Sequence, residues 1–70
     1  MEREPVQSSN LKSVGYDPDS KQLEVEFHSG AVHRYEDVPA KVHQRIMSAK
    51  SPGSYFHNNV RSAYKSTQLL

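Results

Sequence analysis

The chain of 70 residues contains no cysteine. Disulfides, thiol catalysis and thiolate zinc sites are therefore excluded, which argues against a small secreted scaffold. The chain also lacks any apolar run near the roughly 18 residues of a membrane span, and its first residues lack the apolar core of a signal peptide. We therefore expect a cytoplasmic protein that makes no contact with membranes.

Carboxylates are missing from the second half of the chain, where no acidic residue follows Asp37. Residues 1–37 carry eight acidic and four basic side chains, a net charge of −4, whereas residues 38–70 carry five basic side chains and no acid, a net charge of +5. This asymmetry indicates an anionic partner for the second half. The alternative interpretation is that the two halves neutralise each other across the fold.

The length of the chain allows one domain at most, and such a domain buries only about 60% of the surface of its unfolded chain. With 34% hydrophobic and 24% charged residues, the composition is that of a folding sequence. The first residues are polar and lack periodicity. We expect a disordered tail over residues 1–8, a single domain over residues 9–67 and a frayed C-terminus over residues 68–70.

An alternating segment near the middle of the chain predicts a β-strand. In Leu23–Phe27 (LEVEF) the apolar residues occupy every second position and therefore share one face. Glu24 and Glu26 are then expected to point to solvent on the other face. Because Arg34 should lie on that same face of a neighbouring strand, we expect it to pair with Glu24 or Glu26.

Turn signals place two further strands beside this one. In Asp17–Ser20 the proline presets the backbone angle of a turn and Asp17 can accept hydrogen bonds from free amides. Ser29 and Gly30 form a dipeptide typical of a tight hairpin. The sequence therefore predicts a three-stranded antiparallel meander over about residues 10–17, 21–28 and 31–36.

After residue 39 the hydrophobic period changes to that of helices. Val42, Ile46 and Ala49 recur at i, i+4 and i+7 and predict a stripe that faces the core. The Pro-Gly pair at residues 52–53 should end this helix, and Ser54 should cap a second one. The inner face of the second helix is expected to hold four residues: Phe56, Val60, Ala63 and Tyr64. A sheet followed by helices predicts an α+β domain with both helices packed on one face of the sheet.

Several landmarks follow one another in a set order: Gly15-Tyr16-Asp17, the LEVEF segment, Tyr35 shortly before Val38-Pro39, Ala49–Phe56, and Val60-Arg61 with Tyr64. In this order they resemble the KTSC domain family, a small domain found at the C-terminus of some lysyl-tRNA synthetases and as free-standing bacterial and phage proteins. The resemblance covers roughly residues 8–67. The triplet that matches the family's central Tyr-x-Tyr motif is His33-Arg34-Tyr35, with histidine in place of the first tyrosine. The resemblance implies no catalytic residue, and the synthetase fusion suggests RNA binding.

The segment from Ser51 to Lys65 is the candidate site, because it combines cations, aromatics and amides without any acid. Arg61 and Lys65 are spaced i, i+4 and are expected to share a helix face. A cap at Ser54 would leave backbone amides free to bind phosphate. Phe27 and Phe56 are expected in the core, while Tyr35 and Tyr55 are the candidates for exposed rings that stack on bases. The predicted nucleic-acid-binding residues are Lys50, Ser54, Tyr55, Asn58, Arg61, Lys65 and Tyr35.

The four histidines raise the question of a metal site. His28 and His33 could approach each other across the hairpin, but the chain has no known zinc-binding pattern, so we expect neither a metal nor another cofactor. A Gly-rich phosphate loop, a nucleophile elbow and an HExxH motif are also absent. A chain this short rarely encloses a catalytic pocket. We therefore expect a protein that is not an enzyme.

Two hypotheses of function follow. The first is a nucleic-acid-binding module, most plausibly for RNA, with weak and salt-sensitive binding. The second is a protein-interaction module, a monomer or weak dimer that associates with itself or docks onto a larger protein. Apolar side chains such as Val32 or Tyr35 gathered on the exposed face of the sheet would favour a protein partner. Aromatic rings surrounded by lysine and arginine would favour nucleic acid.

Overall fold

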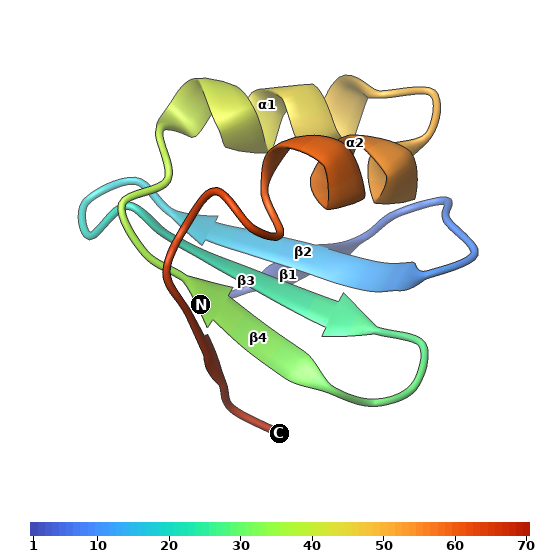
Figure 1. Ribbon diagram of the computed structural model, residues 1–70, viewed down its shortest axis with the longest axis horizontal. Helices are drawn as coiled ribbons and strands as arrows, with labels where there is room; N and C mark the ends of the chain where they lie inside the picture. Colours follow the sequence, from blue (N-terminus) through green and yellow to red (C-terminus); the bar gives the residue numbers. More distant parts are fainter.

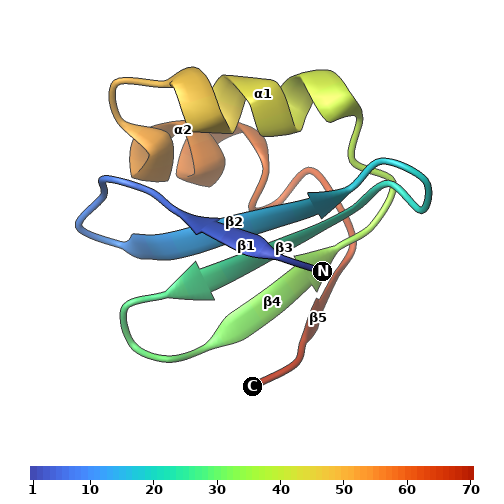
Figure 2. The ribbon, with the colours of Figure 1, turned by 180° about the vertical axis from the view of Figure 1, so that it is seen from behind.

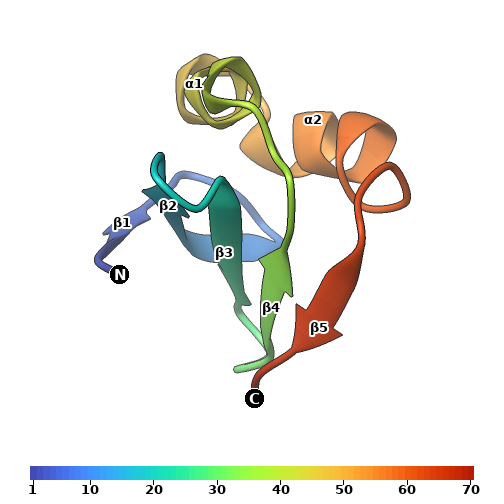
Figure 3. The ribbon, with the colours of Figure 1, turned by 90° about the vertical axis from the view of Figure 1, so that its left-hand side faces the viewer.

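The computed structural model describes residues 1–70 and contains one antiparallel sheet with two helices on one of its faces (Figure 1). The strands follow one another in space in the order β1-β2-β3-β4-β5, and both helices lie between β4 and β5 in the chain. Figure 3, in which the ribbon is turned by 90°, shows the two helices above the sheet. The elements are β1 Arg3–Pro5, β2 Leu11–Asp17, β3 Gln22–Phe27, β4 Val32–Tyr35, α1 Ala40–Ser48, α2 Pro52–Asn59 and β5 Ser66–Gln68.

The α+β class and the two helices are confirmed, but the prediction of three strands is wrong, because the sheet has five. β1 lies within the segment 1–8 that was expected to be disordered, and it pairs with β2. β5 pairs with β4 at the other edge, and the amide of Leu69 beyond it donates to the Val32 carbonyl at 2.7 Å. Figure 2 shows both edge strands from behind. Each of these strands is only three residues long, which is too short to show the alternation of apolar and polar residues by which a strand is recognised in a sequence.

The hydrophobic core lies between the sheet and the helices. Leu23 and Val25 of β3 are fully buried and meet Val42 and Ile46 of α1, which confirms two residues of the stripe predicted for the first helix. The third, Ala49, follows the end of α1 with extended backbone and does not belong to the stripe. Phe56 of α2 adds its ring to the same cluster and is 3% exposed. Burial of this apolar area is the main force that holds the helices on the sheet.

The second helix begins and ends earlier than predicted. Pro52 occupies its first turn and Ser51 its N-cap position, because the fixed backbone angle of proline suits the start of a helix. Ser54 is therefore not the cap but a residue of the first turn, and its hydroxyl accepts a hydrogen bond from the Ser51 hydroxyl at 2.9 Å. The amides of Val60 and Arg61 both donate to the Phe56 carbonyl, at 2.9 and 3.0 Å, and the chain turns away there.

Because α2 ends at Asn59, two further expectations are wrong. Ala63 is exposed and does not lie on an inner helix face, although Tyr64 is half-buried against the core. Arg61 and Lys65 follow the helix and share no face of it. Residues spaced i, i+4 share a helix face only where the helix includes both of them.

Glu24 was expected to face solvent but is buried, with 10% of its side chain exposed. It lies in the same cross-strand row as Gly15 and Arg34, with Arg3 opposite Gly15. The Arg3 Nη1 atom lies 2.9 Å from Glu24 Oε1, and Arg34 Nη2 lies 3.4 Å from Glu24 Oε2, which confirms the predicted pairing of Arg34. A Cβ atom at residue 15 would lie 2.9 Å from Arg3 Cγ, so glycine is what lets Arg3 cross β2 to reach Glu24.

All three salt bridges of the protein join residues of the first half of the chain, the third being Lys12 with Glu26 at 3.9 Å. Glu26 also accepts a hydrogen bond from the Ser13 hydroxyl at 2.8 Å. Two of the eight acidic residues, Glu24 and Glu26, are therefore paired with cations on the face of the sheet turned away from the helices. No salt bridge joins an acid of residues 1–37 to a base of residues 38–70, as the alternative of mutual neutralisation would require.

We expect the substitution Glu24→Gln to lower the free energy of unfolding by about 2 kcal/mol, because two partly buried guanidinium groups lose their carboxylate. Glu2→Gln is the matched control, since it removes the same charge from an exposed side chain and should change stability by less than about 0.5 kcal/mol. Urea unfolding of both variants measures the difference. Equal stability of the two variants would contradict a structural role for the Arg3–Glu24–Arg34 row.

Candidate functional site

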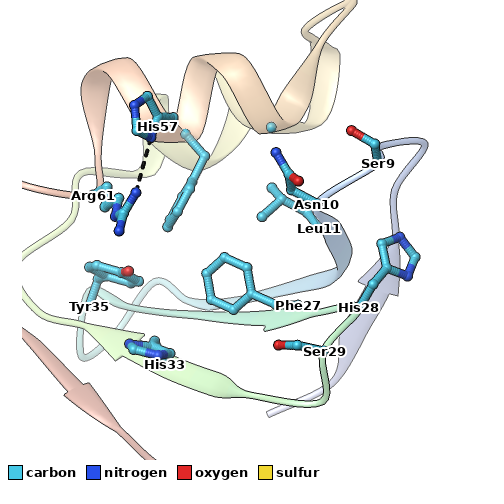
Figure 4. Close-up of a pocket in the computed structure, with 12 residues that line it drawn as sticks. Ser9, Asn10, Leu11, Phe27, His28, Ser29, His33, Tyr35, His57 and Arg61 are labelled. Atoms are coloured by element: carbon cyan, nitrogen blue, oxygen red, sulfur yellow. Dashed lines mark hydrogen bonds between the residues drawn. The ribbon is translucent and has the colours of Figure 1, made fainter.

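A cleft of about 600 Å³ opens between the β3–β4 hairpin and α2 (Figure 4). Its walls come from the start of β2, the hairpin, β4, α2 and the turn that follows α2. Figure 4 shows side chains of the sheet facing those of α2 across the opening. The lining residues are Ser9, Asn10, Leu11, Phe27, His28, Ser29, His33, Tyr35, Gly53, Phe56, His57 and Arg61.

The floor of the cleft is aromatic. The Phe56 ring meets Phe27 edge-on at 5.7 Å between centroids and Tyr35 edge-on at 5.3 Å. His33 extends this group, with its ring 5.5 Å from Phe27 and nearly perpendicular to it. Phe56 and Tyr35 are buried, but Phe27 is half-buried and leaves ring surface in the cleft. Phe27 was expected in the core, and the structure places it at the margin of the core instead.

The charge of the cleft has one sign, because its lining contains one arginine and three histidines but no carboxylate. Arg61 Nη1 lies 3.3 Å from His57 Nδ1. Since a guanidinium group only donates hydrogen bonds, His57 Nδ1 is the acceptor in this contact. A site with basic groups and no acid attracts anions, and the low-dielectric floor beside it strengthens that attraction.

Both the burial and the positive charge of the cleft act on the pKa of the Tyr35 phenol. Burial raises the pKa of the Tyr35 phenol, because the charged phenolate is poorly solvated there. The positive charge of Arg61 acts in the opposite direction and lowers the pKa of the same phenol. The side chain of Arg61, from the turn after α2, therefore acts electrostatically on β4 across the cleft.

The seven predicted site residues are distributed over several surfaces. Tyr35 and Arg61 line the cleft, but Tyr35 is 3% exposed and is not the exposed stacking ring that was expected, because it faces the helices and packs under Phe56. Tyr55 is half-buried against the core. The other four, Lys50, Ser54, Asn58 and Lys65, are exposed and lie outside the lining of the cleft.

Sequence reasoning missed Phe27, His33 and His57 as residues of one site. Phe27 and His33 flank the hairpin at residues 28–31, and His57 lies one residue after the buried Phe56. The spacing of Phe27 and His33 around a tight turn was the available signal, since it puts both on neighbouring strands and on the face toward the helices. The position of α2 over that face could not be read from spacing.

The histidines form no metal centre in this structure. His28 Nε2 lies 2.9 Å from the Ser8 carbonyl oxygen, and His33 packs among the aromatic rings. No three histidine, cysteine, aspartate or glutamate side chains lie close enough together to hold a metal ion. The helices are also too short and too polar for any of them to cross a membrane.

The geometry of the cleft predicts that Arg61→Gln raises the pKa of the Tyr35 phenol further, because a nearby cation that stabilises the phenolate is removed. Arg45→Gln on the exposed side of α1 is the matched control and should leave this pKa unchanged. The measurement is a pH titration of the tyrosine Cζ signals by ¹³C NMR. An unchanged Tyr35 pKa in Arg61→Gln would mean that Arg61 does not reach the cleft.

Comparison with known proteins places this fold in a family. The family model of the KTSC domain matches residues 7–64, which is most of the chain. The crystal structure of a KTSC domain protein from Yersinia pestis superposes with a TM-score of 0.95 at 36% identity, over 99% of this chain and 97% of that one.

Sequence relatives include free-standing proteins and a part of a larger enzyme. An uncharacterized protein of Stutzerimonas stutzeri is 53% identical over 57 residues, which cover 81% of this chain and 80% of that protein. A lysine–tRNA ligase of a Nostoc species is 35% identical over 63 residues, which cover 90% of this chain but only 11% of the ligase. With the family model, the solved structure and these relatives in agreement, the chain belongs to the KTSC domain family.

Proposed function

We propose that the protein is a small non-catalytic binding module whose ligand is single-stranded RNA, held in the cleft between the β3–β4 hairpin and α2. The observation that carries the proposal is the cleft's composition: an aromatic floor with one arginine and three histidines beside it, without a carboxylate. Such a surface suits a chain of bases and phosphates, because aromatic faces stack on bases while cations contact the backbone.

Each group has a distinct role in the proposal. The half-buried ring of Phe27 offers a face to one base, an interaction worth about 1–3 kcal/mol per base. Arg61 is exposed and donates to a phosphate. Lys50 and Lys65 lie outside the cleft and add long-range attraction, and Ser54, Tyr55 and Asn58 lie along α2 where a longer strand would pass. Few charges imply micromolar binding that weakens with salt.

The relatives support a ligand of this kind. The segment that matches this chain is a small part of lysine–tRNA ligases from Nostoc and Trichormus, enzymes named for their tRNA substrate. A domain of the same family in an enzyme that handles RNA is compatible with an RNA-binding role of the domain itself. The chain spans about a tenth of those ligases, so their catalytic activity is not proposed for it.

The second candidate function, a protein-interaction module, is less favoured by the surface. Val32 and Tyr35 were the residues whose exposure would have indicated a protein partner, and they are 2% and 3% exposed. The exposed large hydrophobic side chains are Met1, Leu69 and Leu70, all at the chain ends. These leave no broad apolar patch on the sheet, and such a patch is the usual mark of a protein interface.

Non-catalysis is part of the proposal. The histidines of the cleft have no carboxylate beside them to orient an imidazole for proton transfer. The oligomeric state proposed is a monomer or weak dimer, and the location proposed is the cytoplasm.

The test is an NMR titration of ¹⁵N-labelled protein with a short single-stranded RNA and with an RNA hairpin, each at two salt concentrations. We expect shifts on residues 27–35 and 53–61 that weaken as salt rises, with a slope of about −0.7 in the logarithmic plot for each phosphate contacted. Because the bases of the hairpin stem are stacked and paired, the single strand should bind more tightly.

Two variants sharpen this titration. Arg61→Gln should weaken binding about tenfold, while Arg45→Gln, an exposed arginine outside the cleft, should change it by less than about twofold. Phe27→Leu keeps an apolar side chain but removes the aromatic face, so it should also weaken binding. An absence of shifts at millimolar RNA would end the RNA proposal, and the search would then turn to protein partners.

A further inference from the structure

The two ends of the cleft differ in chemistry. Arg61 and His57 lie at one end with the phenol of Tyr35, and Figure 4 shows these three side chains together. Ser9 and Asn10 lie at the other end together with His28, whose Nε2 atom lies 2.9 Å from the Ser8 carbonyl oxygen. The half-buried ring of Phe27 lies between the two ends. A ligand that fills this cleft therefore has an anionic end, an apolar flat centre and a polar end.

The size of the cleft limits the ligand to one such unit. A volume of about 600 Å³ is in the range of pockets that enclose small organic molecules. Its floor offers the partly exposed rings of Phe27 and His33, since Phe56 and Tyr35 are buried. One nucleotide has all three parts in this order: a phosphate, a base that stacks, and base edges that form hydrogen bonds.

The donors at the charged end exceed what an internal phosphate of a strand requires. A phosphodiester carries one negative charge, whereas a phosphate monoester carries a charge of about −1.5 to −2 and three acceptor oxygens. Arg61 offers five N–H donors, and His57 and Tyr35 each offer a further donor beside it. The lining holds no carboxylate that would compete for these donors or repel a dianion.

We infer that the cleft is a site for a single nucleotide that bears a phosphate monoester, with the phosphate at Arg61 and His57 and the base against Phe27. The ligand is then a free nucleoside monophosphate or the phosphorylated end of a strand. Where the ligand is the end of a strand, the inference rests on the proposed function. It adds that the cleft binds the phosphorylated terminal nucleotide of the RNA.

Binding of this ligand also changes the contact between the two basic side chains. Arg61 Nη1 lies 3.3 Å from His57 Nδ1, so each of the two side chains has the other as its partner before a ligand binds. A phosphate between them supplies acceptors to both. The other titratable groups around the cleft are His28 and His33 of the sheet and Tyr35, so no acid opposes this charge.

The experiment compares five probes by NMR titration at pH 6.5: inorganic phosphate, adenosine, adenosine 5′-monophosphate, and one oligoribonucleotide prepared with a 5′-phosphate and with a 5′-hydroxyl. We expect the monophosphate to bind at least tenfold more tightly than adenosine, and the 5′-phosphorylated strand to bind several-fold more tightly than its hydroxyl form. Arg61→Gln should abolish both differences, and Arg45→Gln should preserve them.

A second readout is the variant His57→Gln, which removes the imidazole beside Arg61. The monophosphate should bind this variant several-fold more weakly, while adenosine should bind it as it binds the unchanged protein. An unchanged affinity of the monophosphate for His57→Gln would contradict the placement of the phosphate.

The outcomes separate this inference from the proposed function. Equal binding of the phosphorylated and hydroxyl strands, with adenosine equal to its monophosphate, would overturn the inference while RNA binding stands. Equal binding of inorganic phosphate and the monophosphate would also overturn it, because the base would then contribute nothing. If the monophosphate binds in the cleft and neither strand does, the inference holds for the free nucleotide and the RNA proposal fails.

Discussion

The edge-on packing of Phe56 against Phe27 and Tyr35 is the contact on which the candidate site depends. It joins α2 to β3 and β4 through residues that lie more than twenty positions apart in the chain. The same contact buries Tyr35 and leaves the Phe27 ring half-exposed, which gives the cleft an apolar floor beside its basic rim. Because edge-to-face pairs have a specific geometry as well as a large buried area, this packing also fixes where His57 and Arg61 stand relative to the sheet.

The cleft is basic because its lining includes an arginine and no acidic residue. The buried carboxylate of Glu24 binds two arginines on the outer face of the sheet, and Glu26 is occupied by Ser13 and Lys12. Glu24 and Glu26 are thereby kept on the far side of the sheet from the helices, and no carboxylate lines the cleft. Glu4 is an exception to this separation, because it lies opposite the buried Val14 of β2 and its charge acts on His43 of α1. The cleft itself is basic, although the net charge of the protein is only +1.

The sequence was sufficient where local pattern and burial agree. Alternation in Leu23–Phe27 and the i, i+4 spacing of Val42 and Ile46 in α1 located the core and the face of the sheet that the helices cover. The edge strands β1 and β5 could not be recognised, because three residues are too few to show a period and their stability comes from the strand beside them. The register that puts Arg3 opposite Gly15, and so within reach of Glu24, likewise depends on pairing between segments far apart in the chain.

The candidate site was predicted only in part for a related reason. The composition of residues 51–65 drew attention to Arg61, which lines the cleft, but the prediction assumed one helix through to Tyr64. The early end of α2 turns Arg61 toward the sheet and separates it from Lys65. The other wall of the cleft comes from the β3–β4 hairpin, and no local pattern connects that hairpin with α2.

The most direct test of the account is a measurement of intermolecular nuclear Overhauser effects between a single-stranded RNA and protein labelled with ¹³C in its phenylalanine rings. The account predicts contacts from base protons to the Phe27 ring, together with contacts from ribose protons to the His57 and Arg61 side chains. Contacts confined to the exposed outer side of α2, with none at Phe27, would contradict the cleft as the binding site.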